Sequence, residues 1–244
     1  MVPGSDPVAS WSTVTEPVLV VGRGARANAI NTDACTKAGI RLVHRRSGGG
    51  PVLWDAGLLA LDVVLPAEHP LADRDVTRAY AWIGAALAQA VRALGIPATS
   101  IPLPDARAAQ ARTDPASLLA ARACFGGISP FEVVGPDGGK LVGLSQVRRH
   151  EGTIFQCGIA LEFDAATLAR LLAVDPADAA ALTDALGARA RGLRASRPEL
   201  TNRTVIAAVE DALVDQLDIG MSPGHLTAPE AARQDALALT LTAP

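Results

Sequence analysis

The sequence predicts an α/β domain in which a mixed β-sheet packs against helices, with a small helical appendage at the C-terminal end. Three observations predict this fold class. The chain has 244 residues, 49% of them hydrophobic and 19% charged, which is enough apolar material for one large core. Runs of branched aliphatic residues typical of strands occupy the first two thirds of the chain. Apolar residues at helical spacing dominate the last third.

The predicted strands fall into two groups. The first group comprises residues 18–22, 40–45 and 58–65, which are rich in branched aliphatic side chains and bounded by Gly or Pro. The second group comprises the runs FEVV, KLVGLSQVRR and TIFQCGIAL, joined by the turn sequences GPDGG and HEG. Short turns join antiparallel strands, so the second group predicts a meander that places Lys140 at the start of a strand.

The most regular helical pattern covers residues 76–94, with an aspartate before it and Gly95 after it. Residues 96–123 contain four prolines and many alanines, which predicts a long loop carrying a short helix. Further helices are expected at residues 165–173, 177–186, 202–217 and 229–237. We expect a catalytic domain over residues 1–195 and, within the same domain, the helical appendage over residues 196–244.

Charge and composition argue against several functional classes. The net charge is −3 and no block of like charges occurs, so nothing indicates a nucleic-acid partner. No apolar run reaches the roughly 18 residues of a membrane span, and the first residues do not resemble a signal peptide, so we expect no membrane partner and a cytoplasmic protein. The cysteines, Cys35, Cys124 and Cys157, lack paired spacing, which predicts neither a disulfide framework nor a metal site.

A polar, glycine-rich segment follows the second predicted strand directly. It consists of Arg45, Arg46, Ser47, Gly48, Gly49 and Gly50. Backbone amides free of side chains, beside two guanidinium groups, can bind a phosphate, a carboxylate or a polarised carbonyl. Glycines also allow a ligand to approach the backbone closely. The segment is therefore a candidate ligand-binding loop.

Lys140 is a second candidate because lysine is rare in this chain. Only Lys37 and Lys140 are lysines among 22 basic residues, so a lysine inside a patterned segment can be required for its compact ammonium group. A single cation at the start of a hairpin is expected to contribute little to the core. Replacing it should therefore leave the fold intact.

Two sequence blocks, taken together, resemble a known catalytic domain. The first is RRSGGGPVLWDAGLLALDVV and the second is ACFGGISPFEVVGPDGGKLVGLSQVRRHEGTIFQCGIAL. Their motifs and order resemble the domain shared by lipoate-protein ligases, octanoyltransferases and biotin-protein ligases, over about residues 18–165. The resemblance implies the biotin/lipoate-protein ligase fold. It also implies transfer of an octanoyl or lipoyl group onto a lysine of a lipoyl domain, in a 2-oxoacid dehydrogenase E2 subunit or the glycine-cleavage H protein.

The same resemblance assigns roles to individual residues. In that family the hairpin lysine contacts the activated acyl group, which implies that Lys140 places positive charge beside the carbonyl oxygen during acyl transfer. The glycine-rich segment from Arg45 to Gly50 would wall the acyl pocket. Asp55, Gly143 and Gln146 match the remaining motif positions and complete the expected substrate-binding set.

Cys124 lies in a stretch that resembles the cysteine-dependent octanoyltransferases. In those enzymes the cysteine takes the acyl chain from octanoyl-acyl carrier protein as a thioester and passes it to the lipoyl-domain lysine. The chemistry requires a thiolate near a cation, and Lys140 is the cation that the sequence offers. Cys124 and Lys140 are therefore the predicted catalytic residues, without a bound cofactor.

Two other functions stay open. An ATP-dependent lipoate-protein ligase would need ATP and magnesium, but the Asn-Asp pair that such ligases usually carry is replaced here by Ser129, Pro130, Phe131 and Glu132, which favours thioester transfer. A non-catalytic paralogue that binds lipoyl domains or acyl ligands is the third possibility. Two departures from the family pattern keep it open: Leu144 replaces a small residue, and Cys157 replaces a histidine. The usual helix and strand before residue 18 are also not evident, so we expect the fold to be trimmed at that edge.

Overall fold

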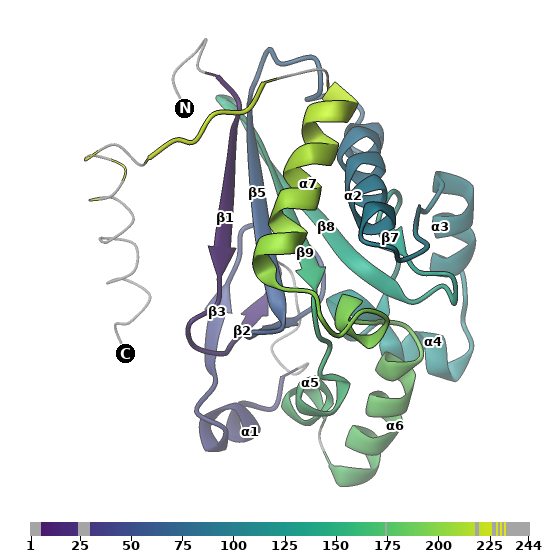
Figure 1. Cartoon of the computed structure of the whole chain (residues 1–244). Coiled ribbons are helices and arrows are strands. Elements are labelled where there is room, and N and C mark those ends of the chain that lie inside the picture. Colours follow the sequence, from purple (N-terminus) through teal and green to yellow (C-terminus); the bar gives the residue numbers. More distant parts are fainter. Residues whose placement is uncertain are drawn as a thin grey trace.

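Two β-sheets form the centre of the molecule, with helices around them (Figure 1). The computed structural model describes residues 6–23, 30–173, 175–217 and 220–225, with single positions at 228, 230 and 232. The first sheet has six strands in the order β1-β5-β9-β8-β7-β6, and the second has three strands in the order β3-β2-β4.

The six-stranded sheet is antiparallel throughout. Its strands, in sheet order, are β1 (Val8–Thr13), β5 (Leu58–Pro66), β9 (Gly152–Ala160), β8 (Lys140–Arg149), β7 (Val133–Val134) and β6 (Thr99–Ser100). Strands β5 and β9 pair without interruption along nine residues each, and β8 continues the ladder on the other side of β9. This ladder is the rigid support on which Lys140 and Gln146 are mounted.

The three-stranded sheet contains the parallel pairing that makes the fold mixed. Strand β2 (Val18–Val21) runs parallel to β3 (Arg41–His44) and antiparallel to β4 (Val52–Trp54). The connection from β3 to β4 is the glycine-rich segment. The segment therefore lies at the end of the small sheet, as the sequence predicted.

The helices differ in length and in what they cover. They are α1 (Thr32–Lys37), α2 (Ala81–Ala93), α3 (Leu103–Gln110), α4 (Pro115–Ala120), α5 (Ala165–Leu172), α6 (Pro176–Gly187) and α7 (Asn202–Leu217), with 3-10 turns η2 (Arg78–Tyr80), η3 (Cys124–Gly126) and η4 (Leu193–Ala195). Aspartates cap several of them: Asp114, Asp164 and Asp175 each accept a hydrogen bond from a backbone N–H of the first turn.

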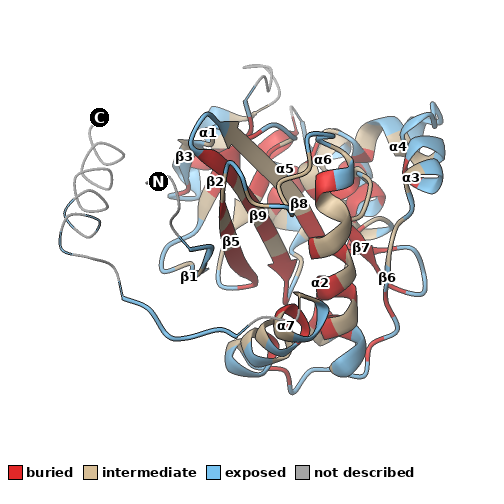
Figure 2. Ribbon diagram, turned by 90° about the horizontal axis from the view of Figure 1, so that it is seen from above, coloured by how far each residue is buried: buried red, intermediate tan, exposed pale blue. Residues whose placement is uncertain are grey.

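The main core lies between the six-stranded sheet and the helix pair α2 and α7 (Figure 2). Leu61 and Phe155 from the sheet pack in one cluster with Ile83 of α2 and Val209 of α7. Helix α7 belongs to the segment predicted as an appendage, and it contributes directly to this core. A second cluster surrounds the small sheet and includes Leu19 with residues of α1, α5 and α6.

Most predicted elements are confirmed. The strands expected at 18–22, 40–45 and 58–65 are β2, β3 and β5, and the predicted meander is β7, β8 and β9. The helices predicted after residue 164 are α5, α6 and α7. The helix expected at 229–237 falls almost entirely outside the described residues. Among the residues that the structure describes, none of the helices combines the length and the apolar character of a membrane span.

Two expectations are corrected. A strand does precede residue 18: β1 pairs antiparallel with β5 from Val8 opposite Val64 to Thr13 opposite Leu59. The region 96–123 is also more regular than a loop, because it contains β6, α3 and α4.

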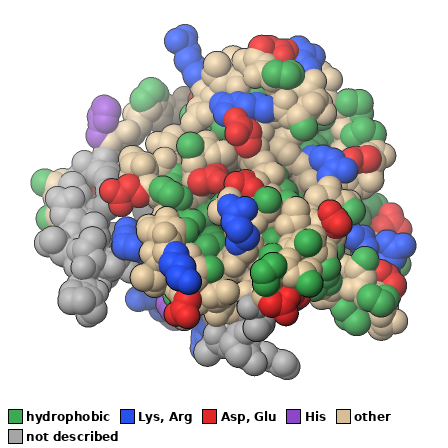
Figure 3. Space-filling model, turned by 90° about the horizontal axis from the view of Figure 1, so that it is seen from below, with side chains coloured by type: hydrophobic (Ala, Val, Ile, Leu, Met, Phe, Trp, Pro, Cys, Tyr) green, Lys and Arg blue, Asp and Glu red, His purple; other side chains and the backbone are tan. Residues whose placement is uncertain are grey.

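On the face shown in Figure 3, acidic and basic side chains intermingle over the described surface, as is typical of a solvated face.

Candidate active site

A cavity of about 450 Å³ opens where the glycine-rich segment, the region from α3 to η3, and strand β8 meet. This volume falls within the range of small-molecule sites. Several of the residues predicted from the sequence line it, namely Arg45, Gly48, Gly49, Gly50, Cys124, Lys140 and Gln146. Residues separated by about a hundred positions in the sequence are thus brought to one cavity.

Other predicted site residues lie elsewhere. Arg46 is exposed, and Ser47 is buried with its hydroxyl 3.4 Å from that of Ser145. Asp55 lies at a separate small hollow, where its carboxylate accepts a hydrogen bond from the Gly57 N–H at 2.8 Å. Burial raises the pKa of Asp55, and the nearby carboxylates of Asp164 and Glu162 raise it further. The structure therefore places Asp55 in a turn outside the cavity.

The glycine-rich segment brings its backbone against Cys124. A Cβ on Gly50 would lie 2.9 Å from the Cys124 nitrogen, which donates a hydrogen bond to the Pro51 carbonyl at 2.9 Å. Gly49 has a φ of +101°, and a Cβ there would lie 2.6 Å from Nη2 of Arg45. Glycine is required at both positions, for close approach at Gly50 and also for backbone conformation at Gly49.

Replacing Gly49 with valine should reduce the acyl transfer that the sequence resemblance implies at least about tenfold, because the new side chain displaces the Arg45 guanidinium and resists a positive φ. The strain should also lower the free energy of unfolding by about 1–3 kcal/mol. Urea denaturation and transfer assays measure the two effects. Gly39→Val is the matched control, because Gly39 has a φ of +67° with nothing within 4 Å of the added Cβ. Equal loss of transfer in both variants would contradict the displacement.

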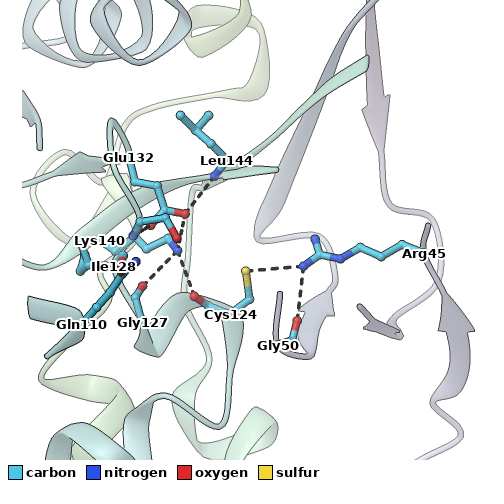
Figure 4. A network of polar contacts seen from close by, with 10 residues as sticks. Arg45, Gly50, Gln110, Cys124, Gly127, Ile128, Glu132, Lys140 and Leu144 are labelled. Atoms are coloured by element: carbon cyan, nitrogen blue, oxygen red, sulfur yellow. Dashed lines mark hydrogen bonds and ion pairs between the residues drawn. The ribbon is translucent and has the colours of Figure 1, made fainter. Parts of the chain in front are cut away.

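Cys124 begins the 3-10 turn η3 and is half-buried at the cavity wall. Its Sγ accepts a hydrogen bond from Nη2 of Arg45 at 3.7 Å (Figure 4). The other two thiols are buried, and burial raises the pKa of both Cys35 and Cys157. Asp62 raises the pKa of Cys157 further. Cys124 is therefore the thiol placed to react with a ligand in the cavity.

Lys140 contacts the backbone around Cys124 instead of its sulfur. Only 1% of its surface is exposed. Its Nζ pairs with Oε1 of Glu132 at 2.7 Å and donates to the carbonyls of Cys124 at 2.9 Å and Gly127 at 3.2 Å. An ammonium has three donors, so these acceptors satisfy it fully. The cation beside the sulfur is Arg45, which differs from the expectation that Lys140 fills this place.

Glu132 is the main site residue that the sequence did not predict. Its carboxylate accepts backbone hydrogen bonds from Ser129 at 2.7 Å and Leu144 at 3.1 Å, in addition to the ion pair with Lys140. Glu132 is 1% exposed, so an ion pair with full hydrogen bonding is what permits its burial. A usable signal was present: a lysine in an apolar strand needs an acidic partner, and Glu132 is one of two acids between Cys124 and Lys140.

The backbone before Glu132 is strained. Phe131 has a φ of 67°, the one positive value among the described residues other than glycine. Its carbonyl accepts a hydrogen bond from the Ser100 hydroxyl at 3.0 Å and lies against Gly84 of α2, where a Cβ would come within 2.2 Å. Packing against α2 therefore holds a conformation that directs Glu132 toward Lys140.

Gly143 supports the site from behind. A Cβ at Gly143 would lie 3.2 Å from Cε of Lys140 and 3.5 Å from the ring of Phe125. A Cβ at Gly158, on the neighbouring strand, would lie 3.8 Å from the same ring. The two glycines make room for Phe125 to pack on the sheet, with the Lys140 ammonium 5.1 Å from its ring centroid.

Gln146 lines the cavity and also holds the chain before α2. Its side-chain amide donates to the Val76 carbonyl at 2.7 Å and is hydrogen-bonded to Tyr80. Burial raises the pKa of Tyr80 to about 12, so its phenol is neutral at physiological pH. Leu144 also lines the cavity, and its backbone N–H, not its side chain, donates a hydrogen bond to the Glu132 carboxylate. A larger side chain at this position is compatible with that bond.

Comparison with known proteins identifies the domain. A family model described as the lipoyl protein ligase A/B catalytic domain matches residues 3–216. Octanoyltransferase LipM of Bacillus anthracis is 30% identical over 223 residues, covering 86% of this chain and 75% of that protein. Octanoyltransferase LipM of Brevibacillus brevis is 29% identical over 237 residues, covering 95% of this chain and 82% of that protein.

Solved structures agree on the fold. A bi-partite lipoate protein ligase from Thermoplasma acidophilum, described with its E2 lipoyl domain, has a TM-score of 0.75 and 20% identity, covering 96% of this chain and 80% of its own. A lipoate-protein ligase A bound with ATP has a TM-score of 0.69 and 19% identity, and the match covers 96% of this chain and 82% of the ligase chain. The fold expected from the sequence resemblance is confirmed.

Proposed function

This chain belongs to the lipoyl protein ligase A/B catalytic-domain family, and we propose that it is an octanoyltransferase that acts through a thioester on Cys124. One observation carries the proposal: the Cys124 thiol lines the cavity and lies 3.7 Å from a guanidinium group. A cation near the sulfur favours the thiolate, which is the nucleophilic form. The two LipM relatives support the same reaction class.

The first half-reaction loads the enzyme. The Cys124 thiolate attacks the thioester carbonyl of octanoyl-acyl carrier protein, a new carbon–sulfur bond forms to Cys124, and the bond to the carrier's sulfur breaks. The carrier leaves as a thiolate and takes a proton from water. The glycine-rich segment forms the wall beside the reacting sulfur, because its backbone lies against Cys124.

The second half-reaction transfers the acyl group to a lipoyl domain, of an E2 subunit or a glycine-cleavage H protein. The neutral lysine amine attacks the thioester, an amide bond forms, and the bond to Cys124 breaks. The amine's proton passes to solvent, and the thiolate is regenerated. The Thermoplasma ligase described together with an E2 lipoyl domain supports this class of partner.

Lys140 and Glu132 form the support beneath the nucleophile in this proposal. The ammonium binds the carbonyls of Cys124, the first residue of η3, and of Gly127, which follows the turn, and thereby fixes the turn that carries Cys124. Direct contact between Lys140 and the acyl carbonyl stays a prediction. One of the three present bonds of Nζ would have to open for that contact to form.

The ligase alternative predicts a different use of residues 129–132. Glu132 stands where the ATP-dependent ligases carry their Asn-Asp pair, and its carboxylate is already bound by Lys140 and two backbone amides. This arrangement supports thioester transfer over adenylate formation. If the ligase alternative holds, ATP and magnesium would be required.

The test is the intact mass of the protein after incubation with octanoyl-acyl carrier protein. We expect one octanoyl adduct that hydroxylamine removes, as for a thioester, and that is lost when an apo lipoyl domain is added. Lipoylation only with free lipoate and ATP, without an adduct, would select the ligase. Inactivity in both assays would leave the non-catalytic paralogue.

A further inference from the structure

We infer that Arg45 is a second catalytic residue, whose guanidinium holds the sulfur of Cys124 as a thiolate before acyl transfer and again when the sulfur departs. This inference rests on the proposed function and deepens it. It gives Arg45 a place in the chemistry, beyond forming part of the cavity wall.

The first argument is geometric. Nη2 of Arg45 donates to Sγ of Cys124 at 3.7 Å and to the Gly50 carbonyl at 3.4 Å. The backbone N–H of Arg45 donates to the Val21 carbonyl at 2.9 Å, so the residue continues the pairing of β3 with β2. Figure 4 shows the side chain reaching from the end of β3 to the sulfur. The small sheet therefore aims this guanidinium at Cys124.

The second argument concerns charge. The positive charge of Lys140 is compensated by Glu132, whereas within the described residues no carboxylate lies within ion-pair distance of Arg45. In the same part of the chain, the Nε of Arg45 is buried and has no hydrogen-bond partner. A guanidinium cannot lose its proton, so its uncompensated charge favours an anion beside it. The sulfur of Cys124 is the group placed to become that anion.

The third argument is the shape of the glycine-rich segment. Any Cβ at Gly49 would lie 2.6 Å from Nη2 of Arg45 and 3.8 Å from Sγ of Cys124. Residue 49 thus faces the point where the two side chains meet. Its lack of a side chain keeps the guanidinium in contact with the sulfur and leaves the sulfur open to the cavity.

A cation in this position serves both half-reactions. In the first it raises the population of the attacking thiolate. In the second it stabilises the same thiolate as the leaving group when the lysine amine attacks. Lys140 cannot substitute at its present position, because its three donors bind Glu132 and two carbonyls.

The experiment compares Arg45→Gln and Arg45→Lys with the wild type, using iodoacetamide alkylation of Cys124 located by mass spectrometry. At neutral pH we expect alkylation of Arg45→Gln to slow about tenfold or more, and Arg45→Lys to retain part of the rate. At strongly alkaline pH, where thiols ionise without help, the rates should converge. Arg149→Gln, which removes an exposed arginine at the end of β8, should alkylate like the wild type.

The pH profile separates loss of charge from loss of structure. A variant that has buried the thiol would fail to converge with the wild type at alkaline pH, and a misfolded variant would also be alkylated at Cys35 and Cys157, which are buried in the native fold. Unchanged alkylation of Arg45→Gln at neutral pH would overturn the inference. If Arg45→Gln slows alkylation but leaves octanoyl transfer unchanged, the catalytic role of Arg45 would be overturned.

Alkylation needs no acyl donor, so its result does not depend on the proposed function. If the wild type forms no octanoyl adduct, the proposed function fails, and the catalytic role of Arg45 fails with it. The alkylation profile then still decides whether Arg45 holds the thiolate. If the adduct forms and Arg45→Gln slows both alkylation and loading, both proposals are supported.

Discussion

Cys124→Ser is expected to abolish octanoyl transfer from acyl carrier protein, with a loss of about a thousandfold or more. A serine hydroxyl is un-ionised at neutral pH and is a far weaker nucleophile than a thiolate. The substitution should leave the fold intact, because the side chain is half-buried at a cavity wall and serine is similar in size. Transfer is measured by the mass of an octanoylated lipoyl domain.

The other cysteines provide matched controls. Cys35→Ala and Cys157→Ala change buried thiols in the two hydrophobic clusters, so they should lower stability modestly and retain transfer. Cys124→Ser should also be assayed with free lipoate and ATP. Under the ligase alternative it would remain active there, because an adenylate is attacked directly by the acceptor lysine. Full transfer by Cys124→Ser from acyl carrier protein would exclude the thioester.

Lys140→Ala is expected to lower the free energy of unfolding by about 3–5 kcal/mol as well as to remove transfer. The substitution leaves the Glu132 carboxylate buried without its cation, and it leaves the carbonyls of Cys124 and Gly127 without a donor. From the sequence alone, this substitution was predicted to spare the fold. The 1% exposure of Lys140 contradicts the premise of that prediction, which placed this cation outside the core.

The control for the buried pair is the double variant Lys140→Met with Glu132→Gln. Removing both charges should recover much of the lost stability, because no uncompensated charge remains and the amide oxygen of the introduced glutamine side chain still accepts one backbone hydrogen bond. Transfer should remain absent, since η3 has lost its support. Urea unfolding measures the stability. A free energy of unfolding of Lys140→Ala equal to that of the wild type would contradict the burial argument.

The fold was predictable where the residues themselves set the pattern. Strands β2, β5, β8 and β9 contain short runs of aliphatic residues, a pattern that is typical of buried strands. Strand β1 was missed because it is an edge strand whose residues, VASWST, are mostly exposed or half-buried. Prolines at the starts of α3 and α4 looked like loop residues, although proline is also favoured in the first turn of a helix.

The site was predictable as a set but not as a geometry. The order of the motifs predicted that Arg45, Cys124 and Lys140 belong to one site, and in the structure all three line one cavity. Their individual roles depend on where each side chain points at the end of its element, which tertiary packing decides. The same limit explains Asp55, which follows β4 closely in sequence but turns away from the cavity.

The contacts of this cavity also determine when it forms during folding. The Arg45–Cys124 contact spans 79 residues of chain, and the Ser47–Ser145 contact spans 98. Contacts of such separation close late, because each requires a large loss of chain entropy. The small sheet must meet η3 before the guanidinium reaches the sulfur, and it must meet β8 before Ser47 reaches Ser145. During refolding, rapid alkylation of Cys124 should therefore develop with the final docking step and report the completion of the native state.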